Sequence, residues 1–433
     1  MKFFFKVVVF FLIVFNFRLP IVYNSVAIAA ILASIYYVFI RKSIPFSYFF
    51  FRYNTIILAA TILLTLITLS FTIAHDEFSV LFTKRCLVML SMLLALVYVL
   101  PLLIEGNEKT AYEEAAFILC YAFALQGAIH LTGFLVPPVG DFLFDMKPEG
   151  TKAAILDPSA NIDKFRAYAL TGSIFFELPS AYGVACIMFL RIQLMEDQQY
   201  ITSYKSYAIF FLLIIGICLS GRTGFVGIAL GLVWYLFFAY NKLGAIFKTG
   251  VRVLAGYVVL LCAFYLFLSP KQQASFVDDL FPFAFEMYYN YVDEGQLRTA
   301  STDVTMKNFY YPLEDKTLLY GDGVGSREHQ FYKGTDAGYM NALIYGGIPY
   351  LLVLLVYQAL YFIQPVSVAY KRNTRENMID LSCFVLLYIY MLILEYKDTA
   401  LGTQHLTEVI FLFLGSCYLI KYYENQEESE NEN

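Results

Sequence analysis

Apolar residues fill the chain in long runs that short polar or charged stretches separate. A helix that crosses a membrane needs about 20 mostly apolar residues. Twelve runs predict such helices, at residues 3–17, 21–40, 53–74, 86–104, 112–136, 174–195, 206–220, 223–240, 251–269, 336–363, 378–395 and 405–420. Two longer polar stretches, at about 137–173 and 270–335, interrupt this pattern. The pattern predicts an all-α polytopic membrane protein with two long loops.

The composition agrees with this prediction. Hydrophobic residues make up 59% of the 433 residues and charged residues only 15%, whereas soluble domains are about 45–50% apolar and about 25% charged. An ordinary soluble domain is therefore excluded. The net charge of -5 carries little information, because the final ten residues, ENQEESENEN, contain five acids. We expect residues 1–421 to form a single membrane domain and residues 422–433 to form a disordered cytoplasmic tail.

The distribution of Lys and Arg predicts the orientation of the chain in the membrane. With both termini placed in the cytoplasm, the inner segments hold fifteen basic residues and the short outer loops hold five. Cytoplasmic loops carry the excess of basic residues, so this orientation is favoured. It places both long loops on the external face. The N-terminal run lacks a small-residue cleavage site, and we expect it to be an uncleaved first span.

One arginine interrupts the apolar pattern where almost no loop is available. Arg222 lies in LSGRTGFVGIALG, between two predicted spans. Ionisable groups at membrane depth are costly and often functional. Gly224, Gly227 and Gly231 follow it at a spacing that predicts close helix packing.

Further arginines occur in the predicted external loops, at Arg166, Arg298 and Arg327. A guanidinium group matches two phosphate oxygens at once, so several of them at one face would suit a lipid-linked phosphate or pyrophosphate. The alternative is that each contacts lipid headgroups. No grouping of His, Cys, Asp or Glu indicates a metal, and GDGVGS (Gly321–Ser326) is predicted to be a turn, because no Walker lysine follows it.

Three segments resemble the O-antigen polymerase (Wzy) and O-antigen ligase family. RAYALTGSIFFELPS resembles the first catalytic loop of the polymerases, although Leu178 separates Glu177 from Pro179. LSGRTG resembles the Ser-x-Arg-Thr-Gly turn that both groups share. The segment from YGDGVGS through TDAGY to YGGI resembles their closing segment. The resemblance covers roughly residues 160–365.

The resemblance implies a glycosyltransferase with a GT-C-like membrane fold in the bacterial inner membrane. Such an enzyme polymerises undecaprenyl-pyrophosphate-linked oligosaccharide units into O-antigen, capsular or exopolysaccharide on the outer face of that membrane. It transfers glycan from the lipid pyrophosphate to an acceptor sugar hydroxyl, and no metal or other cofactor is expected. The implied partners are the lipid-linked glycans, the bilayer, a chain-length regulator and a flippase, with no nucleic acid.

On this basis we expect Arg166, Arg222 and Arg298 to bind pyrophosphate, with Arg327 and Tyr339 as further substrate contacts. Candidates to orient or activate the acceptor hydroxyl are Glu177, His329 and Asp336. Tyrosines of the second loop, in EMYYNYVDEG and NFYYPL, either stack on sugar rings or anchor the loop at the interface.

Three other functions stay open at this point. A ligase of this family carries a His-Asn pair before the closing helix, but here the segment reads GTDAGY and Gln330 follows His329, which favours a polymerase. A flippase or other transporter places ionisable residues in broken helices near the bilayer midplane, whereas the charges here gather in loops. The third alternative is a non-catalytic partner in a polysaccharide assembly complex.

Overall fold

Within the residues that the structure describes, the fold is all-α apart from one short pair of strands. The structure, a computed structural model, describes residues 2–19, 24–43, 46–48, 50–75, 81–156, 164–172, 176–195, 204–240, 244, 258, 262, 265–266, 268, 270–296, 298–324, 326–327, 330–331, 334–371, 374–398 and 405–431.

The helices of the first half are α1 (Lys2–Phe15), α2 (Ser25–Ile35), α3 (Arg52–Ala74), α4 (Leu81–Ile104), α5 (Ala111–Leu135), α6 (Pro137–Asp145), α7 (Glu149–Leu156) and α8 (Glu177–Met195). The later helices are α10 (Tyr204–Ser220), α11 (Thr223–Phe238), α13 (Pro270–Ser275), α14 (Phe281–Glu294), α15 (Ala300–Val304), α16 (Asp315–Tyr320), α17 (Gly338–Tyr370), α18 (Arg375–Lys397) and α19 (His405–Asn431). Short helical turns are η1 (Tyr36–Arg41), η2 (Phe46–Tyr48), η3 (Glu108–Thr110), η5 (Lys164–Ala167), η7 (Phe276–Leu280) and η8 (Thr305–Phe309). Strands β1 (Ser326–Arg327) and β2 (Gln330–Phe331) pair antiparallel, with Ser326 opposite Phe331.

The prediction of a multi-pass membrane protein is confirmed. Within the described residues, seven helices are long and apolar enough to cross a membrane, at Arg52–Ala74, Phe82–Ile104, Glu108–Leu135, Glu177–Met195, Gly338–Tyr370, Arg375–Lys397 and His405–Gln426. Four shorter apolar helices match further predicted runs, at Phe3–Phe15, Ser25–Arg41, Tyr204–Ser220 and Thr223–Phe238. The predicted span 251–269 lies largely outside the described residues. The total of twelve spans and their orientation stay predictions.

The chain forms two compact units. Unit 1 comprises residues 1–14, 26–115 and 299–433, and unit 2 comprises residues 15–25 and 116–298. One boundary falls between Ala115 and Ala116, inside the continuous helix α5. An uninterrupted apolar helix offers no change of composition at that point, so the division is invisible in the sequence.

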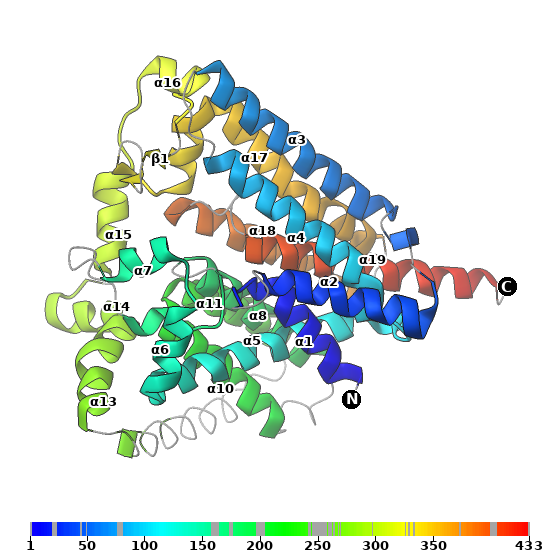
Figure 1. The fold of residues 1–433 in the computed structure, drawn as a ribbon, viewed down its shortest axis with the longest axis horizontal. Helices are drawn as coiled ribbons and strands as arrows, with labels where there is room; N and C mark the ends of the chain where they lie inside the picture. Colours follow the sequence, from blue (N-terminus) through cyan, green and yellow to red (C-terminus); the bar gives the residue numbers. More distant parts are fainter. Residues whose placement is uncertain are drawn as a thin grey trace. The chain divides into compact units, whose positions relative to one another are not determined.

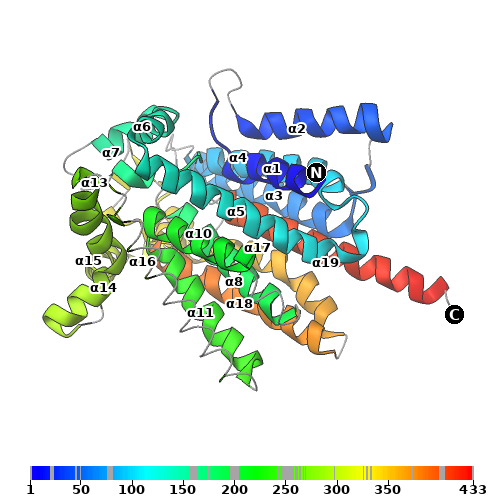
Figure 2. The same cartoon turned by 90° about the horizontal axis from the view of Figure 1, so that it is seen from below.

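In unit 1, helices α3, α4, α17, α18 and α19 pack side by side (Figures 1 and 2). Buried threonines at residues 61, 65, 68 and 72 recur on one face of α3. Thr61 Oγ1 lies 2.9 Å from the Tyr357 hydroxyl, and Thr72 Oγ1 lies 3.0 Å from the Tyr345 hydroxyl. These hydrogen bonds satisfy hydroxyls that would otherwise be costly to bury, and they join α3 to α17.

Helix α17 is broken within its first third, at Gly346 and Gly347. Gly347 has a φ of +68°, which favours glycine, and it directly follows the non-helical Gly346. Two backbone N–H groups of the preceding turn fill the break: Asp322 donates to the Ile344 carbonyl at 2.6 Å and Gly323 donates to the Tyr345 carbonyl at 2.9 Å. Freed carbonyls within a membrane need such partners. Residues 321–324 of GDGVGS are thus non-helical, as the predicted turn requires, and they cap this break.

In unit 2, helix α8 is buried from Leu178 through Gln193 and packs against α10 and α11. Gly227 of α11 faces Gly183 of α8, since a Cβ added to Gly227 would lie 2.6 Å from the Gly183 Cα. Gly224 and Gly231 approach the same helix, with Pro179 and Leu190 as their respective neighbours. The prediction that these glycines allow close helix packing is confirmed.

The C-terminal tail differs from its prediction. Residues 422–433 were expected to be disordered, but α19 remains helical through Asn431. The physical reason is that Glu and Gln are good helix formers, and extending an existing helix avoids the cost of nucleation. The long polar stretches are also not structureless, because α6, α7 and η5 occupy the first and α13 to α16 occupy the second.

Candidate functional site

The turn between α10 and α11 presents Arg222. Helix α10 ends at Ser220 and α11 begins at Thr223, so only Gly221 and Arg222 connect them. The Arg222 side chain is 20% exposed. Burial lowers its pKa, but a guanidinium stays charged at neutral pH. The turn therefore holds a permanent, largely buried positive charge.

Arg166 is held beside this turn. It belongs to η5, and its Nε donates a hydrogen bond to the Ser220 carbonyl at 3.1 Å. The residue before Arg166 is Phe165, and its carbonyl oxygen lies 2.9 Å from Nε2 of His130 in α5. Because a carbonyl oxygen can only accept a hydrogen bond, Nε2 carries the proton. His130 is fully buried. Its hydrogen bond fixes the backbone next to Arg166.

The ring of Phe283 brings the two arginines together. The guanidinium carbons of Arg166 and Arg222 each lie 5.0 Å from the centre of this ring, within the range of a cation–π contact. Glu286 lies three residues further along the chain, just after a kink at Phe285, and it forms an ion pair with Arg222. We call Arg166, Arg222, Phe283 and Glu286 the arginine site. It carries two positive charges and one negative charge.

Glu177 begins helix α8. Its carboxylate at the first helical position interacts favourably with the helix dipole. The same turn packs against the start of α11, because a Cβ added to Gly224 would lie 2.7 Å from the Pro179 carbonyl oxygen. The predicted Glu-Leu-Pro-Ser entry into a helix and the Arg-Thr-Gly turn are thus neighbours.

Arg298 does not share the arrangement of the other two arginines. It forms an ion pair with Glu294, near the C-terminal end of α14. Glu294 lies eight residues beyond Glu286, which corresponds to about 12 Å along a helix. The structure brings Arg166 and Arg222 to the Phe283 ring and places Arg298 in a local i,i+4 ion pair with Glu294; the role expected of Arg298 at pyrophosphate stays a prediction.

Asp336 occupies a half-buried position in unit 1, just before α17. Burial raises its pKa to about 6, although the charge of Lys397 acts in the opposite direction. Its Oδ1 atom is buried and has no hydrogen-bond partner among the described residues. Thr335 fixes the backbone here, since its Oγ1 donates to the Phe309 carbonyl at 3.1 Å and accepts from the Ala337 N–H at 3.3 Å.

Glu395 is a second buried carboxylate, which meets the start of α17, and the sequence did not predict it. It is 0% exposed, and a Cβ added to Gly338 would lie 2.2 Å from its Oε1. Gly338 in TDAGY is therefore needed because the carboxylate of α18 meets the first turn of α17 there. Tyr339, a predicted substrate contact, donates its hydroxyl to the Leu392 carbonyl at 2.8 Å.

The remaining predicted residues have less structural context. Arg327 lies in β1, and nothing of its side chain is described. His329 lies outside the described residues. In the second loop, Tyr288 and Tyr291 are 63% and 53% exposed, so they are accessible to either proposed role, stacking on sugars or anchoring at the interface.

Three further residues of the two long loops were not predicted from the sequence. Phe283 and Glu286 lie in FAFEMYY, where a single acid among aromatic residues was the available signal. Lys147 is buried and donates to the Ala169 carbonyl at 2.6 Å and the Thr171 carbonyl at 2.7 Å. Burial lowers its pKa to about 7. It ties α6 and α7 to the segment that follows η5.

Comparison of the chain with protein-family models and with curated protein sequences finds no match.

Proposed function

We propose that this multi-pass membrane protein polymerises undecaprenyl-pyrophosphate-linked oligosaccharide units on the outer face of the bacterial inner membrane. Its product would be O-antigen, capsular or exopolysaccharide. The observation that carries the proposal is the arginine site, where two guanidinium groups meet at the Phe283 ring. The motif resemblance around Arg166 and Arg222 supports the same reaction.

The reaction breaks the bond between the anomeric carbon of the donor glycan and its pyrophosphate oxygen. The electron pair leaves with undecaprenyl pyrophosphate, and the anomeric carbon bonds to an acceptor hydroxyl oxygen. Negative charge grows on the leaving pyrophosphate as this bond breaks. Preorganised guanidinium groups in a largely buried site stabilise such charge without needing to reorganise, which is the role proposed for Arg166 and Arg222.

Glu286 has a defined role in this scheme. In the absence of substrate it neutralises Arg222 through their ion pair. A pyrophosphate offers Arg222 a stronger bidentate partner than a single carboxylate, so substrate binding exchanges one anion for another. The carboxylate thereby keeps a partly buried charge paired until the substrate arrives.

The acceptor hydroxyl must lose a proton as the new bond forms. Asp336, in unit 1, stays a candidate from the sequence resemblance to accept it, and its pKa of about 6 lies close to neutral pH, where a base works best. Glu177, at the start of α8, is the alternative candidate. His329 stays a candidate on sequence grounds alone.

A transporter gains little support from the broken helix α17. Broken helices in transporters expose backbone groups to a substrate cavity, whereas here the N–H groups of Asp322 and Gly323 fill the break. We retain the ligase as the nearest alternative, because LSGRTG resembles both groups of the family.

Deletion of the gene in the source bacterium, followed by complementation, tests the proposal. Gel profiles of surface glycan from a polymerase deletion show single repeat units and no ladder. Long chains that accumulate on the carrier lipid without reaching their final acceptor would instead indicate a ligase. Unprocessed units retained on the cytoplasmic side would indicate transport.

A further inference from the structure

Helix α14 of unit 2 uses its polar face for contacts within the protein. The helix is regular from Glu286 onward, after its kink. Glu286, Asn290 and Glu294 follow one another at intervals of four residues, so they share one helix face. Glu286 forms an ion pair with Arg222. Asn290 donates a hydrogen bond to the Arg298 carbonyl at 3.0 Å, and Glu294 forms an ion pair with the Arg298 guanidinium.

The opposite face of α14 is apolar and exposed. It consists of Met287, Tyr288, Tyr289, Tyr291 and Val292, which are 49%, 63%, 40%, 53% and 60% exposed. A helix at a water-facing surface normally turns its apolar side chains to the core and its polar side chains to the solvent. Helix α14 has the reverse arrangement. A contiguous exposed apolar surface of this kind marks a contact with another protein or with a membrane.

The apolar surface continues from α14 into the segment that precedes it. Tyr289 lines a groove of about 440 Å³ together with Cys262, Tyr265, Leu266, Phe276, Val277 and Phe281. All of these side chains are apolar or aromatic. Leu266 is 76% exposed and Val277 is 50% exposed. The exposed face of α14 and this groove therefore meet at Tyr289.

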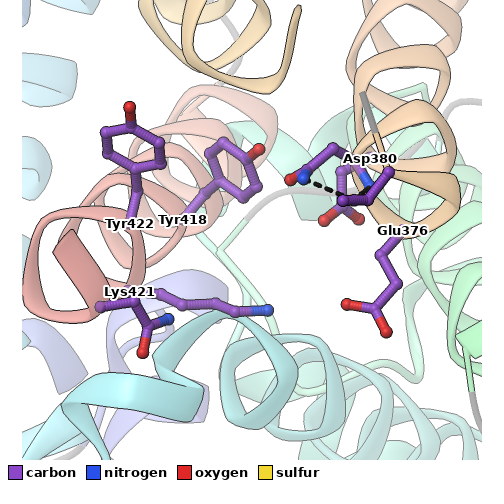
Figure 3. A pocket seen from close by; sticks show the side chains of 8 residues that line it. Glu376, Asp380, Tyr418, Lys421 and Tyr422 are labelled. Atoms are coloured by element: carbon purple, nitrogen blue, oxygen red, sulfur yellow. Dashed lines mark hydrogen bonds between the residues drawn. The ribbon is translucent and has the colours of Figure 1, made fainter. Parts of the chain in front are cut away.

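Helix α18 of unit 1 has the same arrangement of polar and apolar side chains. Asp380 is buried and lines a polar cavity (Figure 3). Val385, Ile389 and Ile393 are exposed, and α18 is long and apolar enough to cross a membrane. Polar groups turned inward and apolar groups turned outward are expected where lipid replaces water. The arrangement in α14 thus has a counterpart in a candidate membrane span of the same chain.

The ion pair of Glu286 places α14 at the edge of the membrane. Its partner Arg222 lies in the two-residue turn between α10 and α11. The sequence predicts both helices to be membrane spans, and a two-residue turn between two spans lies at a membrane surface. The predicted orientation makes this the external surface. Helix α14 is therefore held at the depth where lipid headgroups begin.

We propose that α14 lies in the external membrane interface and docks its apolar face onto the lipid. Three of its five exposed apolar side chains are tyrosines, which favour this depth because they combine an apolar ring with a polar hydroxyl. Residues 286–294 contain three acids and no Lys or Arg, so zwitterionic phospholipid fits this helix better than anionic lipid. The proposal depends only on the membrane location of the chain and is independent of glycosyl transfer.

The single tryptophan of the chain, Trp234, allows a fluorescent reporter to be placed at one position at a time. With Trp234→Phe as background, Tyr291→Trp puts an indole on the apolar face and Asp293→Trp puts one on the opposite side of the same helix. Val233→Trp, at an exposed position of α11, is the control for contact with lipid. Each full-length variant is reconstituted in phosphatidylcholine brominated either near the headgroup or near the end of the acyl chain. Iodide in the external buffer measures exposure to water.

An interfacial helix buries its apolar face about 5–10 Å into the boundary between headgroups and acyl chains. The emission of Tyr291→Trp should therefore lie at shorter wavelength than that of Asp293→Trp. Bromine near the headgroup should quench Tyr291→Trp at least about twofold more than Asp293→Trp, and iodide should quench Asp293→Trp more. Adding Val292→Asp to the Tyr291→Trp chain should reduce its quenching by lipid. Val292 is exposed, so this substitution leaves the folded core intact.

Three results would overturn the proposal. The first is that iodide quenches Tyr291→Trp as strongly as Asp293→Trp, which would place the apolar face in water, where its tyrosines are free to stack on sugars. The second is equal quenching of the two variants by brominated lipid. The third is a Tyr291→Trp emission that neither quencher reaches, which would mean that a protein partner or a second copy of the chain covers the face.

Discussion

Arg222 and Glu286 form an ion pair that joins the two-residue turn between α10 and α11 to helix α14 of the second long loop. Arg222 and Glu286 are 64 positions apart in the sequence. Phe283, which also belongs to α14, contacts both Arg222 and Arg166. The second loop therefore covers the arginines while it supplies their counter-ion. This arrangement makes the behaviour of Glu286 informative about what the arginines bind.

Glu286→Gln should raise the affinity of the purified protein for inorganic pyrophosphate. The substitution keeps the side-chain size but removes the anion that competes for Arg222, and we expect an increase of about tenfold. Calorimetric titration measures it. Glu294→Gln is the matched control, because Glu294 lies on the same helix but pairs with Arg298. Equal affinities in wild type and Glu286→Gln would argue against an anion site at Arg222.

Asp336→Asn should remove the acid limb of the pH–rate profile. The carboxyl of Asp336 has a pKa of about 6, so the wild-type rate of glycan transfer should fall about tenfold per pH unit below that value and level off above it. Initial rates between pH 4.5 and 8 test this. Asp315→Asn, at an exposed position of α16, should retain the limb. If Asp336→Asn left the pH–rate profile unchanged, Asp336 would not be the base, and another group would have to accept the proton.

Lys147 should make stability rise with pH above neutrality. Its folded pKa is about 7, whereas an unfolded lysine has a pKa of about 10.4. Between these values the unfolded chain binds a proton that the native chain does not. Stability therefore increases with pH across this window, by at most about 1.4 kcal/mol per unit. Thermal unfolding midpoints at pH 7 to 9 should show a smaller rise in Lys147→Met than in wild type. Lys316→Met, which removes an exposed lysine, should keep the wild-type slope.

Gly227→Ala should destabilise unit 2 more than Gly231→Ala. A Cβ at Gly227 would lie 2.6 Å from the backbone of Gly183, whereas at Gly231 it would meet the Leu190 side chain at 2.9 Å. A side chain can move more easily than a packed helix backbone, and overpacking of this kind costs about 1–3 kcal/mol. Unfolding midpoints in detergent measure the difference. Equal losses of stability in the two variants would mean that α8 and α11 can move apart at little energetic cost.

The sequence predicted the apolar helices well, because each membrane span must satisfy its length requirement locally. It also anticipated the arginine turn and the glycine face of α11, whose signals are equally local. The partners Phe283 and Glu286 could not be predicted, because nothing in FAFEMYY specifies that α14 folds back onto the turn at Arg222. The same limit applies to Arg298: its residue type suits a phosphate, but only the fold reveals that it pairs with Glu294. Glu395 was overlooked because it lies at the end of an apolar run, where its contact with Gly338 depends on how α17 and α18 pack.

The most direct test of the central claim is glycan transfer by the purified protein, with lipid-linked repeat units extracted from the source cells. The measurement follows chain length and the release of undecaprenyl pyrophosphate together. The account predicts chains of many units, with one carrier lipid released for each bond formed. Arg222→Lys should reduce the rate about 100-fold, as for loss of a transition-state donor, while Arg298→Lys stays within about threefold of wild type, as for an exposed ion pair. A folded wild-type protein that forms no chains from these units, or an Arg222→Lys variant with the full rate, would contradict it.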